Sequence, residues 1–116
     1  MANVLSTSRY KNVKLDLTTA TATTLYTCPA LMTSVVESLL ISNDTSSADT
    51  ITVTLTNDGS VFSLFKVKAV AANTTIELFS KDLILVSGDI IHVTAATANR
   101  LHAVSSIIEI PRSTSA

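Results

Sequence analysis

Apolar and polar residues alternate along much of this chain with a period of two, the pattern of β-strands whose two faces meet different surroundings. The clearest run places Ile51, Val53 and Leu55 between threonines. A similar alternation begins at Lys11 and puts an apolar residue at every second position up to Leu17. Both runs predict strands that cover a core with one face.

Turn signals separate these runs at short intervals. Asp58 and Gly59 form one signal, and Gly88 lies in another. The continuous apolar run at 83–86 is typical of a buried strand, and the last two strands are expected to form a hairpin across 96–100. The predicted strands cover residues 11–17, 24–27, 33–42, 50–56, 61–70, 74–78, 83–86, 90–95 and 101–110.

The predicted strand at 33–42 has apolar residues on both of its faces. Strict alternation puts Val35, Leu39 and Ile41 on one face and Val36 and Leu40 on the other. Such a strand is expected inside a sandwich or at an interface, where both faces are covered.

The residue types support the same class, since 38 of the 116 residues are Thr, Val or Ile. These β-branched side chains pack well on a pleated surface and lose rotamer freedom in a helix. We therefore expect a single all-β domain, an antiparallel two-sheet sandwich of about eight strands. A jelly-roll order is favoured, and an immunoglobulin-like order stays open. The predicted division is an N-terminal arm at 1–10, the sandwich at 11–110 and a C-terminal tail at 111–116.

The charge balance argues against several kinds of partner. Eight Lys and Arg against nine Asp and Glu give a net charge of −1, so no basic stripe is expected to bind nucleic acid. The chain has no apolar run of transmembrane length and no signal-peptide pattern, so we expect no membrane partner and synthesis in a cytoplasm. Only 15% of the residues are charged, which leaves apolar surface uncovered in so small a domain. Self-association is the expected consequence.

Motifs for catalysis or cofactor binding are missing from the sequence. Two glycines cannot make a glycine-rich phosphate loop, and one cysteine cannot make a paired-cysteine zinc site. Cys28 is either a nucleophile or, as we favour, a small half-buried residue. Asp44 and Asp49 could bind Ca²⁺ or cap their loop, and capping is favoured. We therefore predict no catalytic residue, no cofactor and no resident metal.

Some polar and aromatic residues remain as candidates for contacts with other chains. His92 and His102 lie on the two strands of the predicted last hairpin, where they could share a metal; interface histidines are the favoured interpretation. Lys66 and Lys68 could meet an acidic partner or protect a strand edge in solvent. The full set of interface candidates is Tyr10, Lys66, Lys68, His92, His102 and Arg112.

Several segments, taken in order, resemble small structural proteins in the virions of tailed bacteriophages. They are TLYTCPA at 24–30, VVESLLISN at 35–43, ITVTL at 51–55, LVSGDII at 85–91, and the stretch from 98 to 110. The chain differs from the common pattern at Cys28, where an aliphatic residue is usual. It also has Leu31 and Met32 where Gly-Lys often follows the Pro-Ala pair.

The resemblance implies a non-enzymatic role within the virion. Its leading form is a capsid decoration (cement) protein that binds the assembled shell as a homo-oligomer, with a trimer favoured. The alternative is a subunit of the neck, collar or tail. The partners would be the major capsid protein or neck and tail proteins. A receptor- or sugar-binding module is a less favoured function, because the chain has no Trp and only 4% aromatic residues.

Overall fold

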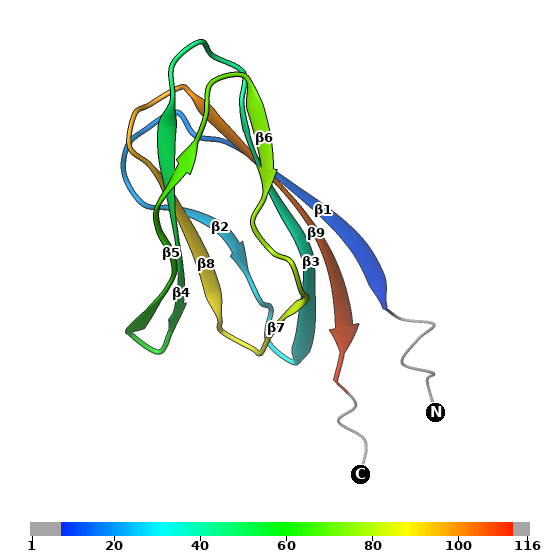
Figure 1. The fold of residues 1–116 in the computed structure, drawn as a ribbon. Helices are drawn as coiled ribbons and strands as arrows, with labels where there is room; N and C mark the ends of the chain where they lie inside the picture. The colour runs from blue at the N-terminus through cyan, green and yellow to red at the C-terminus, as the bar shows by residue number, and fades with distance from the viewer. Residues whose placement is uncertain (1–7, 113–116) are drawn as a thin grey trace.

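The computed structural model describes residues 8–112, which form nine β-strands in two antiparallel sheets packed face to face (Figure 1). The sheets enclose one hydrophobic core. Within this described part there is no helix long and apolar enough to cross a membrane. The sequence-based prediction of an all-β sandwich is confirmed.

The two sheets are named A and B here. Sheet A has the order β1-β9-β3-β6, and β7 also pairs with β3. β6 and β7 pair with different parts of β3, so they lie one after the other along the same edge of that strand. The strands of sheet A are β1 (Arg9–Asp16), β3 (Met32–Asn43), β6 (Thr74–Glu77), β7 (Leu83–Leu85) and β9 (Leu101–Pro111). Sheet B has the order β2-β8-β4-β5. Its strands are β2 (Thr23–Thr27), β4 (Asp49–Asn57), β5 (Ser60–Val70) and β8 (Ile90–Ala95).

The connections between strands have the jelly-roll pattern. The chain changes sheet at every step except from β4 to β5 and from β6 to β7. Among the nine strands only β4 and β5 are sequence neighbours that pair with each other. An immunoglobulin order would pair several sequence neighbours. The strand order is therefore that of a jelly roll and not that of an immunoglobulin domain.

The hairpin predicted for the last two strands is wrong. β8 pairs with β2 and β4 in sheet B, whereas β9 pairs with β1 and β3 in sheet A. The loop at 96–100 thus carries the chain from one sheet to the other. Local sequence does not distinguish this crossing from a hairpin, because both need a short polar loop between two alternating runs.

The faces predicted for β3 are also wrong in its first half. A β-bulge at Glu37 shifts the register against β9 between Val36 and Ser38. Val36, Leu39 and Ile41 consequently all face the core and are fully buried. The extra residue changes the parity of the alternation, so a strict period of two misplaces the residues before it.

The ends of the sandwich differ slightly from the predicted boundaries. β1 starts at Arg9, two residues earlier than expected, and β9 includes Pro111. The predicted arm and tail fall largely on residues 1–7 and 113–116, which lie outside the described residues. The run at 83–86 is only partly buried: Leu85 is in the core, whereas Ile84 and Val86 are exposed.

The core consists of the inward side chains of both sheets. Ile51, Val53 and Val93 come from sheet B and oppose the inward residues of β3 and β9. Each fully buried aliphatic side chain of this kind contributes about 1.5–3 kcal/mol relative to exposure. The inward direction predicted for the alternating run that ends at Leu17 is confirmed, since Leu17 is 1% exposed.

Candidate interaction surface

One buried polar cluster lies at the end of the core, around the carboxylate of Glu109 on β9. Glu109 is 3% exposed, and its Oε2 accepts a hydrogen bond of 2.5 Å from the hydroxyl of Tyr26. Ser34 lies 2.7 Å from the same hydroxyl. Arg9 and Lys11 approach the two carboxylate oxygens at 3.6 Å each. The cluster therefore connects strands of both sheets.

This cluster has the chemistry of a structural network. Burial, and then the hydrogen bond to Glu109, raise the pKa of Tyr26 well above its usual value, so the hydroxyl stays protonated and donates. The ammonium of Lys11 lies 5.6 Å from the centre of the Tyr26 ring, which adds a cation–π contact. Both charged partners of the carboxylate come from β1, so the network fastens this edge strand to the sandwich.

Cys28 is part of the same buried region. Its Sγ lies 3.3 Å from the hydroxyl of Ser34 and otherwise contacts backbone carbonyl oxygens, which do not deprotonate a thiol. The thiol is 1% exposed, more deeply buried than predicted. Asp49 accepts a hydrogen bond of 3.2 Å from the backbone N–H of Thr97, which lies in the loop between β8 and β9 and not in the loop that Asp49 was predicted to cap.

The two histidines lie on opposite outer faces of the sandwich. His92 is on sheet B, with Nδ1 3.4 Å from the hydroxyl of Thr56. His102 is on sheet A, 3.4 Å from Asp16 and 3.8 Å from Asp44. The shared site considered for them is wrong, because it depended on the hairpin. Between residues 8 and 112, no three His, Cys, Asp or Glu side chains are arranged to hold a metal.

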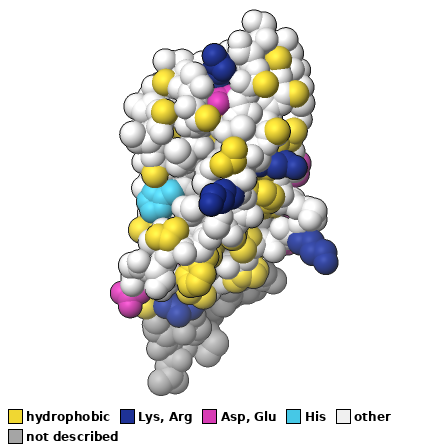
Figure 2. Space-filling view, turned by 60° about the vertical axis from the view of Figure 1, so that its left-hand side comes forward, with side chains coloured by type: hydrophobic (Ala, Val, Ile, Leu, Met, Phe, Trp, Pro, Cys, Tyr) yellow, Lys and Arg dark blue, Asp and Glu magenta, His cyan; other side chains and the backbone are white. Residues whose placement is uncertain are grey.

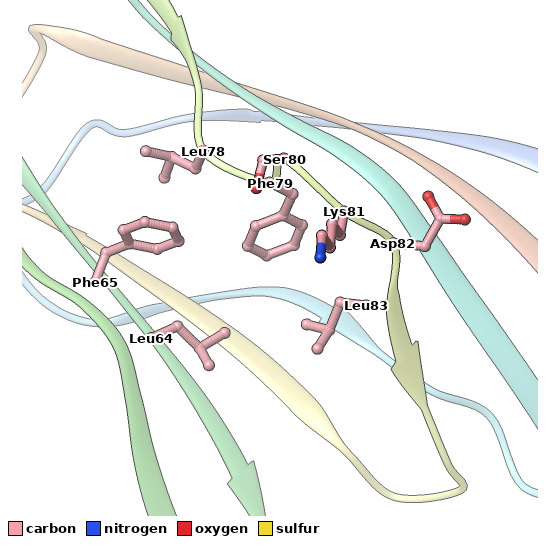
Figure 3. A pocket seen from close by; sticks show the side chains of 8 residues that line it. All are labelled: Leu64, Phe65, Leu78, Phe79, Ser80, Lys81, Asp82 and Leu83. Atoms are coloured by element: carbon pink, nitrogen blue, oxygen red, sulfur yellow. The ribbon is translucent and has the colours of Figure 1, made fainter.

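An apolar pocket of about 280 Å³ lies at one open edge of the sandwich, between β5 and the segment joining β6 to β7 (Figure 3). Phe65 on β5 and Phe79 on this segment face each other with ring centres 6.2 Å apart. The other apolar side chains of the pocket also pack against the core or belong to it. The pocket is thus an extension of the core that opens where the two sheets are not hydrogen-bonded to each other.

The outer face of sheet A, called the A face below, has an apolar row across its strands. Tyr10 is opposite Ile108, which is opposite Val35, which in turn is opposite Ile84. Directly opposed residues share a face of a sheet, so these four side chains all point away from the core. Tyr10 is 84% exposed and Ile84 is 56% exposed.

A second apolar stretch follows further along the same strands. Val104 is opposite Leu40, and this pair has Lys14 on one side and Glu77 on the other. A hollow of about 340 Å³ lies between the two rows, lined in part by Tyr10, Asn12, Glu37 and Ser106. Glu37 is exposed there, because it is the residue that the bulge pushes out of register.

The outer face of sheet B is of a different kind. In β4 the outward positions are all threonines, namely Thr50, Thr52, Thr54 and Thr56. Their inward neighbours Ile51 and Val53 are fully buried. This face matches a solvated sheet surface, whereas the A face has the apolar row from Tyr10 to Ile84 between its polar positions.

Sheet B nonetheless has exposed apolar residues on its edge strand, β5. Val61, Phe62 and Val67 are 64%, 55% and 59% exposed. Lys66 and Lys68 are exposed on the same strand. Figure 2, turned toward the left side of Figure 1, shows hydrophobic side chains spread over this side of the molecule with few charged ones between them. Val67 has a positive φ of 53°, which is rare for a β-branched residue.

The predicted interface residues therefore separate into distinct places. Tyr10 and His102 lie on the A face, at opposite ends of its strands. Arg112 follows β9, where its guanidinium donates a hydrogen bond of 3.0 Å to the hydroxyl of Ser87. Its backbone N–H donates to the carbonyl of Leu31. Arg112 thus has a local structural role within the chain.

The sequence interpretation did not identify the A face as an apolar surface. Alternation assigned Val35 and Leu40 to different faces of their strand, although the bulge puts both on the A face. Ile84 belonged to a run that was predicted to be buried. The only available signal was Glu37, a charged residue that interrupts an apolar strand.

No protein-family model matches the chain, and no characterised protein matches its sequence significantly. Among solved structures, the fold is similar to that of a chain in the T13 IBDV viral particle, with a TM-score of 0.56 and 10% sequence identity. That match covers 90% of this chain but 31% of the viral chain, so this chain spans about a third of its neighbour's length.

Two further matches concern a pentameric capsid protein isolated from metagenomic phage sequences. Their TM-scores are both 0.47, with 21% and 22% identity. They cover 87% of this chain and 60% and 62% of the matched chains.

Proposed function

We propose that this chain is a structural subunit of a viral particle, and that it decorates the assembled capsid shell as an oligomer without catalysing a reaction. A trimer is the proposed stoichiometry, and the virion is the proposed location. Its mechanism is attachment: a protein that binds only the assembled shell stabilises it by its binding free energy.

The apolar A face is the observation that carries this proposal. A free-standing sandwich has polar residues on the outer face of its sheets, as sheet B does with its threonines. On the A face the row from Tyr10 to Ile84 crosses the whole sheet and is exposed at both ends. A contiguous apolar surface of this kind is typical of a protein–protein contact.

Two further observations support the particle as the setting. The jelly-roll order is common in viral capsid domains, and the fold is similar to a chain of the IBDV particle. The segments that resemble small phage virion proteins include β2 and β4, which lie in the same sandwich. The buried cluster around Glu109 has a structural role, which agrees with a function without catalysis.

The test uses the purified full-length protein and particle parts from the phage that encodes it. Labelled protein is mixed separately with capsids lacking it and with isolated tails, and each mixture is sedimented through a density gradient. We expect the protein to sediment with capsids and to raise the temperature at which they rupture. Sedimentation with tails alone would favour the neck or tail alternative. Failure to bind either part would contradict the proposal.

A further inference from the structure

The two ends of the sandwich are built from different kinds of residue (Figure 1). One end, called the polar end below, consists of connections whose residues are all Thr, Ala, Ser, Asn, Asp or Arg, namely those at 18–22, 44–48, 71–73 and 96–100. The opposite end, called the apolar end, consists of the loop at 28–31, the hairpin turn between β4 and β5, and the loop at 86–89.

Large apolar side chains are exposed at the apolar end. Leu31 is 58% exposed, and Val86 is also more than half exposed. Their two loops are held together, because the N–H of Leu31 donates to the hydroxyl of Ser87. Val61, which follows the hairpin turn, is more than half exposed as well. At the polar end, by contrast, the large apolar residue that precedes the first loop, Leu17, is buried.

The backbone of Leu31 is strained and fixed in place. The N–H of Met32 donates to the carbonyl of Pro29, so Leu31 is the third residue of a turn, and its φ is 62°. A positive φ at this position favours glycine and is costly for other residues. The N–H of Leu31 is bonded to Ser87 at 3.0 Å, and its carbonyl accepts the N–H of Arg112 at 2.9 Å. Strain that holds an exposed side chain in one place is concentrated at functional positions.

Arg112 adds a cation beside Leu31. Its guanidinium donates to the hydroxyl of Ser87, the same group that accepts the N–H of Leu31. A guanidinium has five donors in a planar fork that fits a carboxylate, so this single bond leaves donors for a partner. Arg9 lies at the same end with its side chain 65% exposed, and Asp58 is exposed on the hairpin turn. The apolar end therefore suits an apolar surface that carries carboxylates.

The contrast between the two ends indicates a partner on one side only. A second copy stacked head to tail would press the apolar end against small polar loops, and Leu31 would then have no large apolar residue to contact. A protein attached to a shell meets its partner at one end and solvent at the other. Ser8 and Arg112, the first and last described residues, both lie at the apolar end. A partner bound there lies within reach of residues 1–7, which extend to at most about 25 Å.

We propose that the apolar end is the surface by which this chain attaches to the capsid shell, with Leu31 inserted among apolar residues of the shell protein and Arg112 bound to one of its carboxylates. The proposal rests on the proposed function and specifies its contact surface. In a trimer whose axis runs along the strands, all three apolar ends face the same side. Three weak contacts then act together, because the first one raises the effective concentration for the others.

The first test is Leu31→Gly in the full-length protein. Glycine adopts a positive φ without strain, so the variant should be at least as stable as the wild type in urea and keep its oligomeric mass in light scattering. Its binding to capsids that lack the protein, measured by gradient sedimentation, should be about tenfold weaker or more, as is usual when an anchor side chain is removed. Asn73→Gly is the matched control, because Asn73 has a φ of 53° at the polar end, and it should bind like the wild type.

The second test is Arg112→Glu, which reverses a charge at the apolar end. Capsid binding should become weaker and should decrease less when salt is added. Arg100→Glu is the matched control, because the guanidinium of Arg100 also donates one local hydrogen bond of 3.0 Å, to the carbonyl of Ala48 at the polar end. This control should bind capsids like the wild type. Cooperative thermal melting establishes that both variants fold.

Other outcomes overturn the proposal. If the wild type binds capsids and both Leu31→Gly and Arg112→Glu bind them equally well, another surface makes the attachment, while the proposed function stands. If Leu31→Gly has a smaller mass than the wild type, Leu31 packs between copies and not against the shell. A wild-type mass of twice the trimer would show that apolar ends pack against each other. If the wild type does not bind capsids, the proposed function fails together with this proposal.

Discussion

At the scale of single residues, the contacts of Glu109 explain why a jelly roll with a weakly charged sequence keeps an anion inside. Its carboxylate has a hydroxyl donor from Tyr26 and two cations from β1. Between residues 8 and 112, no buried side-chain nitrogen or oxygen lacks a hydrogen-bond partner. An unpaired carboxylate at this position would cost several kcal/mol. The sequence alone did not show this cluster, because its members come from strands that are far apart in the chain.

Removing the hydroxyl of Tyr26 should therefore destabilise the fold. We expect Tyr26→Phe to lower the free energy of unfolding by about 1–3 kcal/mol, since Glu109 and Ser34 lose a buried partner. Urea unfolding measures the change. Tyr10→Phe is the matched control and should differ from the wild type by less than about 0.5 kcal/mol, because Tyr10 is exposed. Equal stability of both variants would contradict the role given to Tyr26.

The same residue gives a prediction about alkaline pH. The folded-state pKa of Tyr26 lies above the ordinary value of 10.0, so its contribution is present below pH 10 and is lost as the pH rises beyond it. The stability difference between wild type and Tyr26→Phe should therefore shrink as the pH rises above 10. Urea unfolding of both proteins on either side of pH 10 measures it. A difference that stays constant would show that Tyr26 ionises equally in the folded and unfolded states.

At the scale of strands, the alternation of apolar and polar residues predicted where each strand lies in the sequence. It did not predict which strands pair with each other. β4 follows its pattern throughout, because threonines face solvent and aliphatic residues face the core. β3 departs from it at Glu37, where one inserted residue changes which side chains face the core. Sheet membership depends on contacts between distant strands, so the crossing from β8 to β9 was not predictable from either strand.

The pattern in β4 gives a direct test of inward and outward positions. Val53→Asp should prevent folding, because it buries a charge without a partner in the centre of the sheet. The adjacent Thr54→Asp should melt cooperatively with a small change in stability. Circular dichroism during heating measures both variants. A soluble, cooperatively melting Val53→Asp protein would contradict the strand assignment.

The strained position in β5 predicts a stabilising substitution. Val67→Gly should increase the free energy of unfolding, or leave it unchanged, because glycine removes a strain of about 1–2 kcal/mol and adds an entropic cost of about 0.5–1 kcal/mol. Val61→Gly on the same strand gains no such relief and should lose stability. Denaturant unfolding compares the two variants. A loss at Val67 as large as that at Val61 would show that Val67 is not in the left-handed conformation.

At the scale of the whole molecule, the composition indicated that apolar surface is exposed, but it did not indicate where on the molecule that surface lies. Few charges and many apolar residues imply exposed apolar surface in so small a domain. Its location on the A face depends on the bulge at Glu37 and on the jelly-roll order, which bring Tyr10, Val35 and Ile84 into one row. Such a surface is a property of the assembled fold and of no single segment.

The central claim is that this chain works by contacts with other copies of itself and with a viral shell. The most direct measurement is the solution mass of the wild-type protein by light scattering across a wide concentration range. The account predicts a stable assembly of about three times 12.2 kDa. A monomer of 12.2 kDa at every concentration would contradict it.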